Sequence, residues 1–346
     1  MKVLVTGSTG FIGQRLVREL SQKGHELYLL IRPQSKKKAQ DIFKDLEKIT
    51  IIEGDIEDTD VVKNITSVSN YLNEIESLVH TAAFYHLEAG LSRAYVSNVI
   101  GTQNIIHLMS KMTSLKHFFY FSTYAVNPLG QGLIREDDLI EEDLLLPDYY
   151  SKTKNHAEHI VRKQTPKNIQ TIIFRPGTVI GDSKTGIMDK KDGPYYYFDF
   201  IETLKKLKLS PQKIPFLPIP TTENSFFPVI PVDVLADWCA HIISHPPKER
   251  MRCYHLVPNP PIKTKEFLEE AMKLQGFPVK ILPIKYTKLV APLLPIVSIP
   301  KEAAVYMNQQ TDFDRSQFNA DYPDLKCPAY QDYLPTLINQ YLRHVT

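Results

Sequence analysis

The chain has 346 residues, of which 43% are hydrophobic and 23% are charged, and its formal net charge is +2. This length is enough for one large domain or two coupled domains with a substantial core. The small net charge, without any run of five like charges, argues against a nucleic-acid-binding surface. The three cysteines lack the spacing of a disulfide or metal motif, and the N-terminus lacks the apolar segment of a signal peptide. We therefore expect a cytoplasmic globular protein without a resident metal.

The N-terminal segment combines a strand pattern, a glycine-rich turn and a helix pattern. A short apolar run predicts a strand over 3–5, and an apolar stripe at helical spacing predicts a helix that stops at Gly24. Between them lie Gly7, Gly10 and Gly13. In α/β proteins such a turn holds the pyrophosphate of a dinucleotide on backbone N–H groups and the helix N-terminus. We predict a dinucleotide site here; an ordinary strand–helix turn is the alternative.

Strand and helix patterns then alternate along the first half of the chain. Further strands are predicted over 26–31, 50–52, 77–80, 117–122 and 170–174, and helices over 35–46, 91–112 and 148–164. Alternating elements of this kind predict an α/β Rossmann fold with a doubly wound parallel sheet.

Composition changes after residue 176, where prolines and aromatic residues become frequent. We expect residues 1–176 to form an NADP-binding Rossmann domain, to which a segment near 226–258 returns. Residues 177–225 and 259–346 would form a smaller C-terminal substrate-binding lobe. In that lobe, 313–324 reads as a polar loop and 333–343 as a closing helix. The apolar, proline-broken segment 289–300 is too short to span a bilayer and could be core, a lid or a peripheral membrane contact.

The end of the second strand indicates which nucleotide is bound. Arg32 stands where an NAD-binding unit carries an acidic residue for the ribose 2′-hydroxyl, and an arginine there suits the 2′-phosphate of NADPH. Lys36 and the two lysines after it could add positive charge, or they could simply form the solvated start of a helix.

A second group of residues points to catalysis. Ser122 and Thr123 end the predicted strand 117–122, at the sheet edge where ligands of open α/β folds bind. Tyr150 and Lys154 are four residues apart in a predicted helix and so share a face. A cation beside a phenol lowers the pKa of the phenol, which makes Tyr150 a usable proton donor. Tyr322 and Lys326 match the same spacing, but prolines bracket that pair and no strand precedes it. His80 is interpreted as a packed turn residue rather than a base.

Taken in order, several motifs resemble the extended short-chain dehydrogenase/reductase pattern. They are Thr6-Gly-x-x-Gly-x-x-Gly13, Gly54-Asp55, His80-Thr-Ala-Ala83, Asn98-Val-Ile-Gly-Thr102, Ser122-Thr123, Tyr150-x-x-x-Lys154 and Arg175-Pro-Gly177. The resemblance implies that Thr123 binds the substrate oxygen, Tyr150 is the acid/base and Lys154 holds the ribose and tunes Tyr150. It also implies an adenine site, a nicotinamide-ribose site and a nicotinamide wall. The residues expected at the cofactor are Gly7, Thr9, Gly10, Phe11, Ile12, Gly13, Arg32, Lys36, Asp55, Ile56, Ala82, Ala83, Asn98, Tyr150, Lys154, Pro176 and Val179.

A finer resemblance concerns the substrate. The segment 180–198 and the strand end 29–33 are similar to those of bacterial fatty acyl-CoA reductases and thioester reductases. The segment 122–128 lacks the Val-Tyr-Gly ending of nucleotide-sugar enzymes. We therefore expect NADPH-dependent reduction of an acyl thioester, carried on coenzyme A or an acyl carrier protein, to an aldehyde. Alternatives are an NADP-dependent reductase of a sterol-like or other apolar ketone, a nucleotide-sugar epimerase or dehydratase, and a non-catalytic NADP(H) sensor. A homodimer through the two long helices is common among similar proteins.

Overall fold

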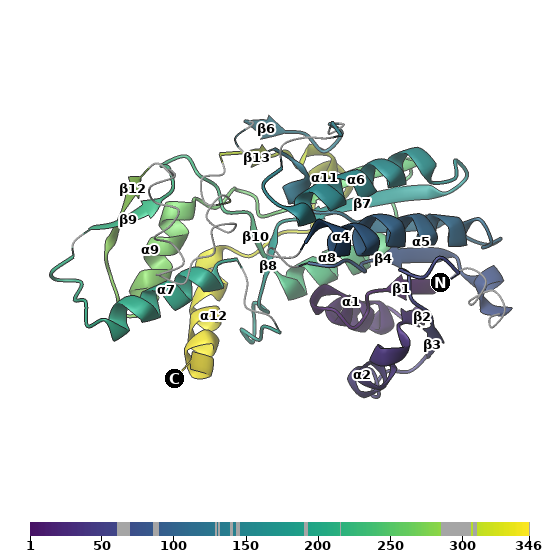
Figure 1. Ribbon diagram of the computed structural model, residues 1–346, viewed down its shortest axis with the longest axis horizontal. Coiled ribbons are helices and arrows are strands. Elements are labelled where there is room, and N and C mark those ends of the chain that lie inside the picture. The colour runs from purple at the N-terminus through teal and green to yellow at the C-terminus, as the bar shows by residue number, and fades with distance from the viewer. Residues whose placement is uncertain are drawn as a thin grey trace. The chain divides into compact units, whose positions relative to one another are not determined.

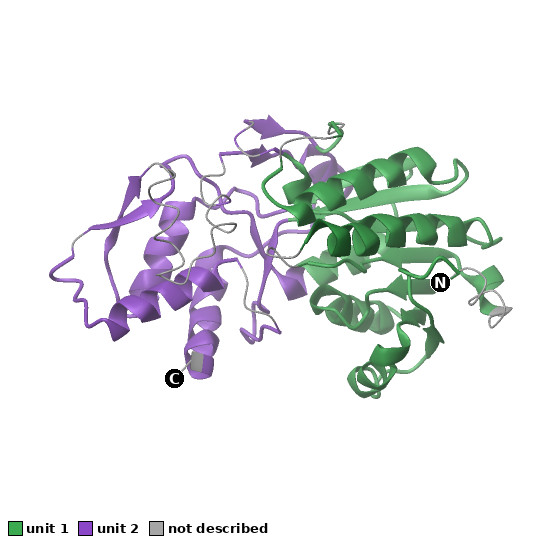
Figure 2. Cartoon of the chain, viewed as in Figure 1, with its two compact units in different colours: residues 1–127, 136–176, 235–255 green, residues 128–135, 177–234, 256–346 purple. Residues whose placement is uncertain are grey.

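The computed structural model describes residues 1–60, 70–85, 90–128, 130, 132–138, 141–142, 146–189, 193–214, 216–284, 306 and 310–345. The chain forms two compact units (Figure 2). Unit 1 comprises residues 1–127, 136–176 and 235–255, and unit 2 comprises residues 128–135, 177–234 and 256–346. The segment 128–135, which no sequence signal separates from its neighbours, thus belongs to unit 2.

Unit 1 is built on a seven-stranded sheet in the order β11-β7-β5-β4-β1-β2-β3. Neighbouring strands run parallel, as in the pairs β1–β2 and β1–β4. The strand order reverses between β1 and β4, which is where dinucleotides bind in this architecture. The Rossmann fold expected from the sequence is therefore confirmed. The strands are β1 (Lys2–Thr6), β2 (Glu26–Ile31), β3 (Ile49–Glu53), β4 (Ser77–His80), β5 (His117–Phe121), β7 (Gln170–Pro176) and β11 (Met251–Leu256).

Both faces of this sheet are covered. Leu78 and Phe118 pack into a core cluster with α5 and α6, while their chain neighbours Val79 and Phe119 point to the opposite face and are equally buried. Strands buried on both faces read as nearly continuous apolar runs, which is why these segments were recognisable from the sequence. The helices of unit 1 (Figure 1) are α1 (Phe11–Gln22), α2 (Lys36–Ile42), α4 (Leu91–Tyr95), α5 (Gly101–Met109), α6 (Tyr149–Gln164) and most of α8 (Val232–Ser244).

Two helix boundaries have local causes, and two predicted helices are shorter than expected. Gly24 follows α1 with φ +80°, so the predicted stop is confirmed. Asp148 caps α6 because its Oδ1 accepts from the Ser151 N–H at 2.8 Å. The predicted helix 91–112 is interrupted, since the stretch Val96–Ile100 (η3) between α4 and α5 is π-helical and α5 ends at Met109. The predicted helix 35–46 is shorter too, because a 3-10 turn precedes α2 and α2 ends at Ile42.

Unit 2 has its own core, made by helices and short paired strands. The pairs β8–β10, β9–β12 and β6–β13 are all parallel. Buried aromatic residues of α7 pack against α9 and α12, so Tyr195, Tyr197 and Phe198 fill the core of this unit, whereas Tyr196 is only half-buried. The elements are β6 (Leu133–Ile134), β8 (Thr178–Ile180), α7 (Tyr195–Lys206), β9 (Phe216–Pro220), β10 (Val229–Pro231), α9 (Thr264–Leu274), β12 (Lys280–Ile284), β13 (Asp312–Phe313), α11 (Ser316–Asp321) and α12 (Tyr330–Val345).

Two sequence-based expectations for the C-terminal part have clear outcomes. The closing helix expected over 333–343 lies inside α12 and is confirmed. The loop expected over 313–324 is wrong, because β13 pairs with β6 there and α11 buries Phe318. The pairing of β6 with β13 joins segments far apart in the chain, so no local sequence pattern predicts it. The apolar segment 289–300 lies outside the described residues. Among the helices that are described, none is long and apolar enough to cross a membrane.

Candidate active site

A crevice of about 360 Å³ opens at the carboxyl ends of the first four strands of unit 1. Its walls come from the glycine turn after β1 and from the loops that follow β2, β3 and β4. The lining residues are Thr6, Gly7, Ser8, Thr9, Gly10, Leu30, Ile31, Arg32, Ser35, Lys38, Gly54, Asp55, Ile56, Glu57, Thr81, Ala82, Ala83, Phe84, Arg93 and Ser97. The residues expected at the adenine and the nicotinamide ribose (Asp55, Ile56, Ala82 and Ala83) are among them.

The turn after β1 has no room for side chains at two glycines. Gly7 has φ +71°, and a Cβ placed on it would lie 2.5 Å from the Ala82 nitrogen. A Cβ on Gly13 would lie 2.2 Å from the Gly7 carbonyl oxygen. The first turn of α1 is thereby held close to β1, with Gly10 as its N-cap. The open N-terminus of α1 suits an anionic group.

Ser8 gives an independent sign that a polar ligand fits this crevice. Its hydroxyl is buried and has no hydrogen-bond partner among the residues that the structure describes, although it lines the crevice. Buried polar atoms are nearly always paired. A phosphate or ribose oxygen would satisfy the Ser8 Oγ, so the residues present fit a dinucleotide. Ser8 was not predicted from the sequence, because only the glycines of the turn have a recognisable spacing.

The positive side of the crevice differs in one respect from expectation. Arg32 is exposed and lines the crevice, as the sequence suggests. Lys36, however, forms an ion pair with Glu53 at 2.6 Å and does not line the crevice. Lys38 takes that place, with its Nζ donating to the Thr9 carbonyl at 3.1 Å. The first turn after Arg32 is a 3-10 turn, which changes the direction in which each following lysine points.

His80 is part of a buried hydrogen-bonded chain rather than a free base. The Thr102 hydroxyl donates its proton to the Asn98 carbonyl. In its 3.2 Å contact with His80 Nε2, the Thr102 oxygen is therefore the acceptor and the His80 Nε2–H is the donor. His80 Nδ1 then accepts from the Thr6 hydroxyl at 2.7 Å, and Thr6 accepts from the Ala82 N–H. Burial, and secondarily the charge of Lys154, lowers the pKa of His80 to about 3. A neutral His80 therefore ties the ends of β1 and β4 together.

Asn98 acts on the loop that follows β4. Its Oδ1 accepts from the Phe84 N–H at 2.7 Å, and its Nδ2 donates to the Phe84 carbonyl and to Thr153 Oγ1. Asn98 lies in the π-helical stretch η3, and such distortions are frequent at functional sites. This side chain thus fixes a wall of the crevice to helix α6.

Thr123 lies just beyond β5 and is buried. Its Oγ1 accepts from the Ala125 N–H at 3.2 Å and caps the short helical turn Tyr124–Val126 (η4). Because that hydrogen bond uses an oxygen lone pair, the hydroxyl proton of Thr123 can still donate to a ligand. Tyr150 is half-buried in the first turn of α6, and its ring meets the ring of Tyr85 edge-on, with centroids 4.7 Å apart.

Lys154 is buried one turn further along α6 and contacts β5. Its Nζ donates to Tyr120 Oη at 2.8 Å and to the Phe121 carbonyl at 2.5 Å. The Nζ also lies 4.3 Å from the centroid of the Tyr120 ring. Burial lowers the pKa of Lys154 to about 7, and the negative charge of Glu158 opposes that change. Lys154 is therefore poised to gain or lose its charge near neutral pH. The spacing of Tyr150 and Lys154 predicts that they share a face of α6, whereas no pattern in the sequence points to Tyr120.

A buried ion cluster continues from Lys154 along the same helix. The Glu158 carboxylate accepts two hydrogen bonds from Arg175, at 2.6 and 3.1 Å, and one from the Ser122 hydroxyl at 2.6 Å. Arg162, one turn later, also donates to Glu158. The cluster joins α6 to β7 and to the end of β5. It explains why Ser122 holds the fold together, whereas its neighbour Thr123 keeps a donor available.

The remaining residues expected at the cofactor have defined places in the fold. Phe11 and Ile12 begin α1, and Pro176 ends β7. Val179 lies in β8 of unit 2, paired with Ile230. Their roles at the cofactor stay predictions.

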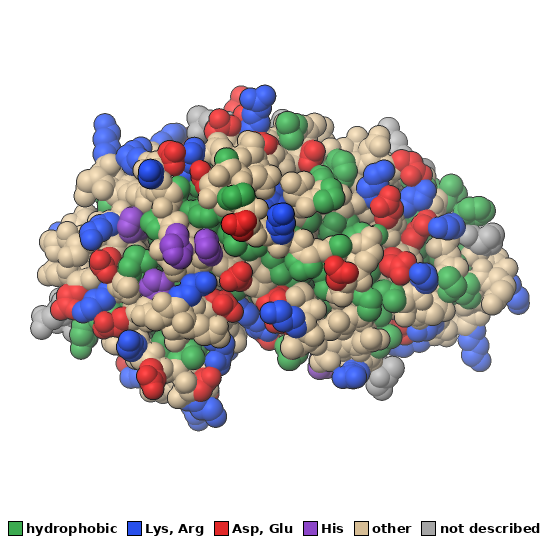
Figure 3. Space-filling view, turned by 180° about the vertical axis from the view of Figure 1, so that it is seen from behind, with side chains coloured by type: hydrophobic (Ala, Val, Ile, Leu, Met, Phe, Trp, Pro, Cys, Tyr) green, Lys and Arg blue, Asp and Glu red, His purple; other side chains and the backbone are tan. Residues whose placement is uncertain are grey.

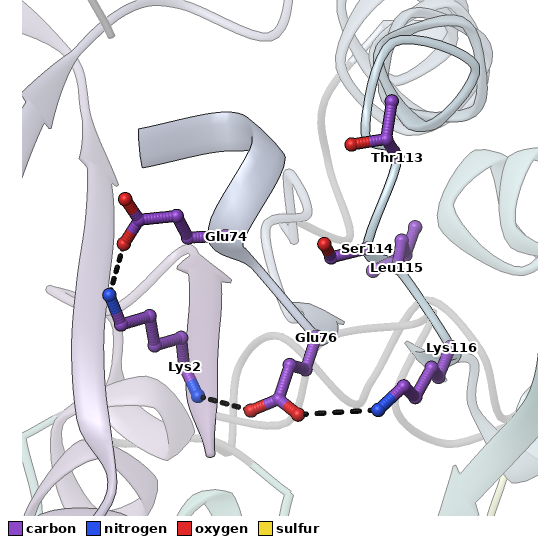
Figure 4. Close-up of a pocket in the computed structure, with 7 residues that line it drawn as sticks. All are labelled: Lys2, Glu74, Glu76, Thr113, Ser114, Leu115 and Lys116. Carbon is purple, nitrogen blue, oxygen red and sulfur yellow. Dashed lines mark hydrogen bonds and ion pairs between the residues drawn. The ribbon is translucent and has the colours of Figure 1, made fainter. Parts of the chain in front are cut away.

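A second hollow lies at the opposite edge of the sheet, where β1 and β4 begin (Figure 4). Its charged residues pair with one another: Lys2 with Glu74, and Lys116 with Glu76. Internal pairing leaves this hollow without an evident ligand preference.

The strand order, the glycine turn and the buried lysine on α6 fit a Rossmann fold of the extended short-chain dehydrogenase/reductase class. A family model described as "Male sterility protein" matches residues 5–239, so the chain belongs to that family. The family membership also supports a nicotinamide cofactor. The resemblance to the group of fatty acyl-CoA reductases, predicted from the sequence, is confirmed as a family relationship.

Among curated proteins, the chain is 30% identical over 188 residues to a 3-beta-hydroxysteroid dehydrogenase of Mycolicibacterium neoaurum, a match that covers 52% of the chain and 48% of that protein. It is 27% identical over 238 residues to the fatty acyl-CoA reductase wat of Drosophila melanogaster, which covers 56% of the chain and 46% of that protein. The chain thus spans about half the length of these relatives.

Among solved structures, the terminal R domain of the myxalamid PKS-NRPS biosynthetic pathway is similar, with a TM-score of 0.79 and 22% identity, covering 99% of the chain and 91% of that domain. The UDP-Glc/GlcNAc 4-epimerase of Campylobacter jejuni has a TM-score of 0.66 and 16% identity, covering 99% of each chain. At these identities the likeness establishes the fold alone.

Proposed function

We propose that this protein reduces an acyl thioester, on coenzyme A or on a carrier protein, to an aldehyde with NADPH. The observation that supports the proposal is that Thr123 lies just beyond β5, Lys154 contacts β5 from α6, and Tyr150 lies one turn before Lys154 on α6. The chain also belongs to a family related to fatty acyl-CoA reductases. A further relative, the L-2-aminoadipate reductase large subunit of Candida glabrata, also supports a reductase.

The cofactor would be held by residues already described. The glycine turn and Ser8 would bind the pyrophosphate, and Asp55 with Ile56 would flank the adenine. Arg32 and Lys38 would face a 2′-phosphate, which favours NADPH over NADH. When bound, the nicotinamide supplies the hydride that reduces the substrate carbonyl carbon.

The carbonyl oxygen would be served by two hydroxyl donors. Thr123 and Tyr150 would donate hydrogen bonds to it as negative charge develops, and Tyr150 would transfer its proton to that oxygen. The product is a hemithioacetal. Its C–S bond then breaks, the hydroxyl proton passes to the leaving sulfur, and an aldehyde and a free thiol are released.

Lys154 would stabilise the ionised form of Tyr150 and hold the nicotinamide ribose. Two of its ammonium hydrogens are used by Tyr120 and by the Phe121 carbonyl. One remains for the ribose or for the Tyr150 oxygen. Lys154 therefore has to be protonated in the active enzyme.

The test is an NADPH-oxidation assay with acyl-CoAs of graded chain length, in which free thiol is measured in the same sample. One thiol released for each NADPH consumed supports the proposal. Turnover of apolar ketones alone, with no thiol released from any acyl-CoA or acyl carrier, would contradict it.

That last outcome would favour a second candidate, an NADP-dependent reductase of a sterol-like ketone. The relative at 30% identity, named a 3-beta-hydroxysteroid dehydrogenase, is the observation that keeps it open. The same three residues would serve this reaction, so the substrate and not the site distinguishes the two.

A further inference from the structure

Unit 2 has an exposed edge in which apolar and basic side chains alternate. It consists of the end of α7, the segment 207–214 and the outer face of the β9–β12 ribbon, and we call it the basic–apolar edge. Lys205 Nζ donates to the Gln275 carbonyl at 3.1 Å, which joins the end of α7 to the end of α9. Phe216 pairs in register with Lys280 where the ribbon begins. These parts therefore lie at one end of unit 2, at the left in Figure 1.

The apolar side chains of this edge point into solvent. Leu207 is 63% exposed, Phe216 58% and Leu282 51%. Successive side chains of a strand point to opposite faces, which explains why Phe216 and Leu282 are exposed. Their chain neighbours Leu217 and Ile281 are buried in the core of unit 2. Phe216 and Leu282 lie on paired strands two residues apart in register, and Leu207 lies in the segment that leads to β9. Exposed apolar residues that are neighbours in this way mark a contact surface.

Lysines outnumber acidic residues on this edge. Between residues 203 and 222 the sequence has four lysines and no acidic residue. Lys205 pairs with Glu202, but Lys206, Lys208 and Lys213 are exposed and form no ion pair among the described residues. In the space-filling view, basic and hydrophobic side chains intermingle at this end of unit 2, at the right in Figure 3.

We propose that the basic–apolar edge binds the surface of an anionic lipid bilayer. Side chains that project outward suit insertion between lipid headgroups better than they suit the capture of a partner helix, which needs a groove. The lysine stems can lie along the apolar layer while their ammonium groups reach phosphates. Each such lysine contributes about fivefold to partitioning onto an anionic surface, so Lys206, Lys208 and Lys213 together contribute about 100-fold.

The experiment is co-sedimentation with vesicles of phosphatidylcholine, alone or with about one third phosphatidylserine. We expect the protein to bind the phosphatidylserine vesicles about 100-fold more strongly than the phosphatidylcholine vesicles, and less strongly as salt is raised. The triple variant Lys206→Gln, Lys208→Gln, Lys213→Gln should lose about 100-fold of that binding. The double variant Leu207→Ser, Phe216→Ser keeps the charge and should also lose binding.

The matched control is Lys111→Gln, Lys167→Gln, Lys248→Gln, which removes the same charge from exposed positions of unit 1 that form no ion pair with any residue the structure describes. It should bind like the wild type, and thermal unfolding of all variants verifies that they fold. Equal binding to both vesicle types, or equal loss in the control, would overturn the proposal. A triple variant that binds vesicles normally but raises KM for a carrier-linked thioester would also overturn it, because the partner would then be an acidic protein. Vesicle binding requires no turnover, so its result is independent of the proposed reaction.

Discussion

Lys154 Nζ donates a hydrogen bond of 2.8 Å to Tyr120 Oη, from helix α6 to the neighbouring strand β5. Both side chains are almost fully buried. Burial raises the pKa of Tyr120 well above 10, so the phenol stays neutral and offers the ammonium a lone pair. The contact fixes where the ammonium lies and favours its charged form. Glu158, one turn along α6, acts in the same direction, while neutral His80 on β4 brings no charge.

Tyr120→Phe should move the alkaline limb of the pH–rate profile to lower pH. Lys154 acts when protonated, so activity is present below its pKa of about 7 and is lost as the pH rises through it. Removing the Tyr120 hydroxyl, which accepts from Lys154, lowers the pKa of Lys154 further. Activity is therefore lost at a lower pH on the alkaline side of the profile. The measurement is kcat/KM against pH. Tyr28→Phe, which removes another buried strand tyrosine hydroxyl, is the control and should leave the limb in place; the same limb in both variants would exclude the role given to Tyr120.

Tyr150→Phe should lower kcat by about 10²-fold or more, because proton transfer to the substrate oxygen is lost. Nucleotide binding, followed by fluorescence titration, should change little. The neighbouring Tyr149→Phe removes an exposed hydroxyl from the same helix turn and should retain activity. A Tyr150 variant that reduces a true substrate at the wild-type rate would rule out this residue as the acid.

Arg32→Ala should weaken NADPH binding by about 10- to 100-fold, the contribution expected of a charge-assisted pair with a 2′-phosphate. NADH binding should stay the same, since that ligand lacks the phosphate. Lys37→Ala is the control, because Lys37 is exposed nearby but does not line the crevice. The measurement is a titration of the variant with NADPH and with NADH. An equal loss of affinity for the two nucleotides would show that Arg32 does not bind the 2′-phosphate.

Glu158→Gln should destabilise the fold by about 3–5 kcal/mol, because it leaves the buried Arg175 without its counter-charge. Burial alone would raise the pKa of Glu158, but Arg175 and Arg162 hold it well below its usual range. The stabilisation by the carboxylate is therefore present above the unfolded pKa and is lost as the pH falls towards the folded one. Urea unfolding at neutral and acidic pH should show a difference between variant and wild type that shrinks in acid. Glu142→Gln, which breaks an exposed ion pair, should have little effect.

Gly13→Ala should abolish nucleotide binding, because the new methyl group would lie 2.2 Å from the Gly7 carbonyl oxygen and force α1 away from β1. Gly90→Ala is the control, since a Cβ there meets none of the described residues within 4 Å. Calorimetric titration with NADPH compares the two. Unchanged affinity of the Gly13 variant would mean that the turn does not form the cofactor cradle.

The sequence by itself determined the fold class and several parts of the site. Strands buried on both faces are continuous apolar runs, so β2 and β4 were predicted with the bounds that the structure shows. The glycine turn was recognisable because part of its steric constraint acts between residues that are close in the chain: a Cβ on Gly13 would collide with the Gly7 carbonyl oxygen. The shared face of Tyr150 and Lys154 follows from helix geometry alone.

Only the tertiary structure decided which partners these residues have. Tyr120 meets Lys154, and Arg175 meets Glu158, because separate elements pack side by side in the sheet and on its face. Likewise, a 3-10 turn after β2 puts Lys38 rather than Lys36 on the wall of the crevice. Burial and side-chain direction depend on atoms contributed by segments far along the chain, and a local pattern contains no information about those atoms.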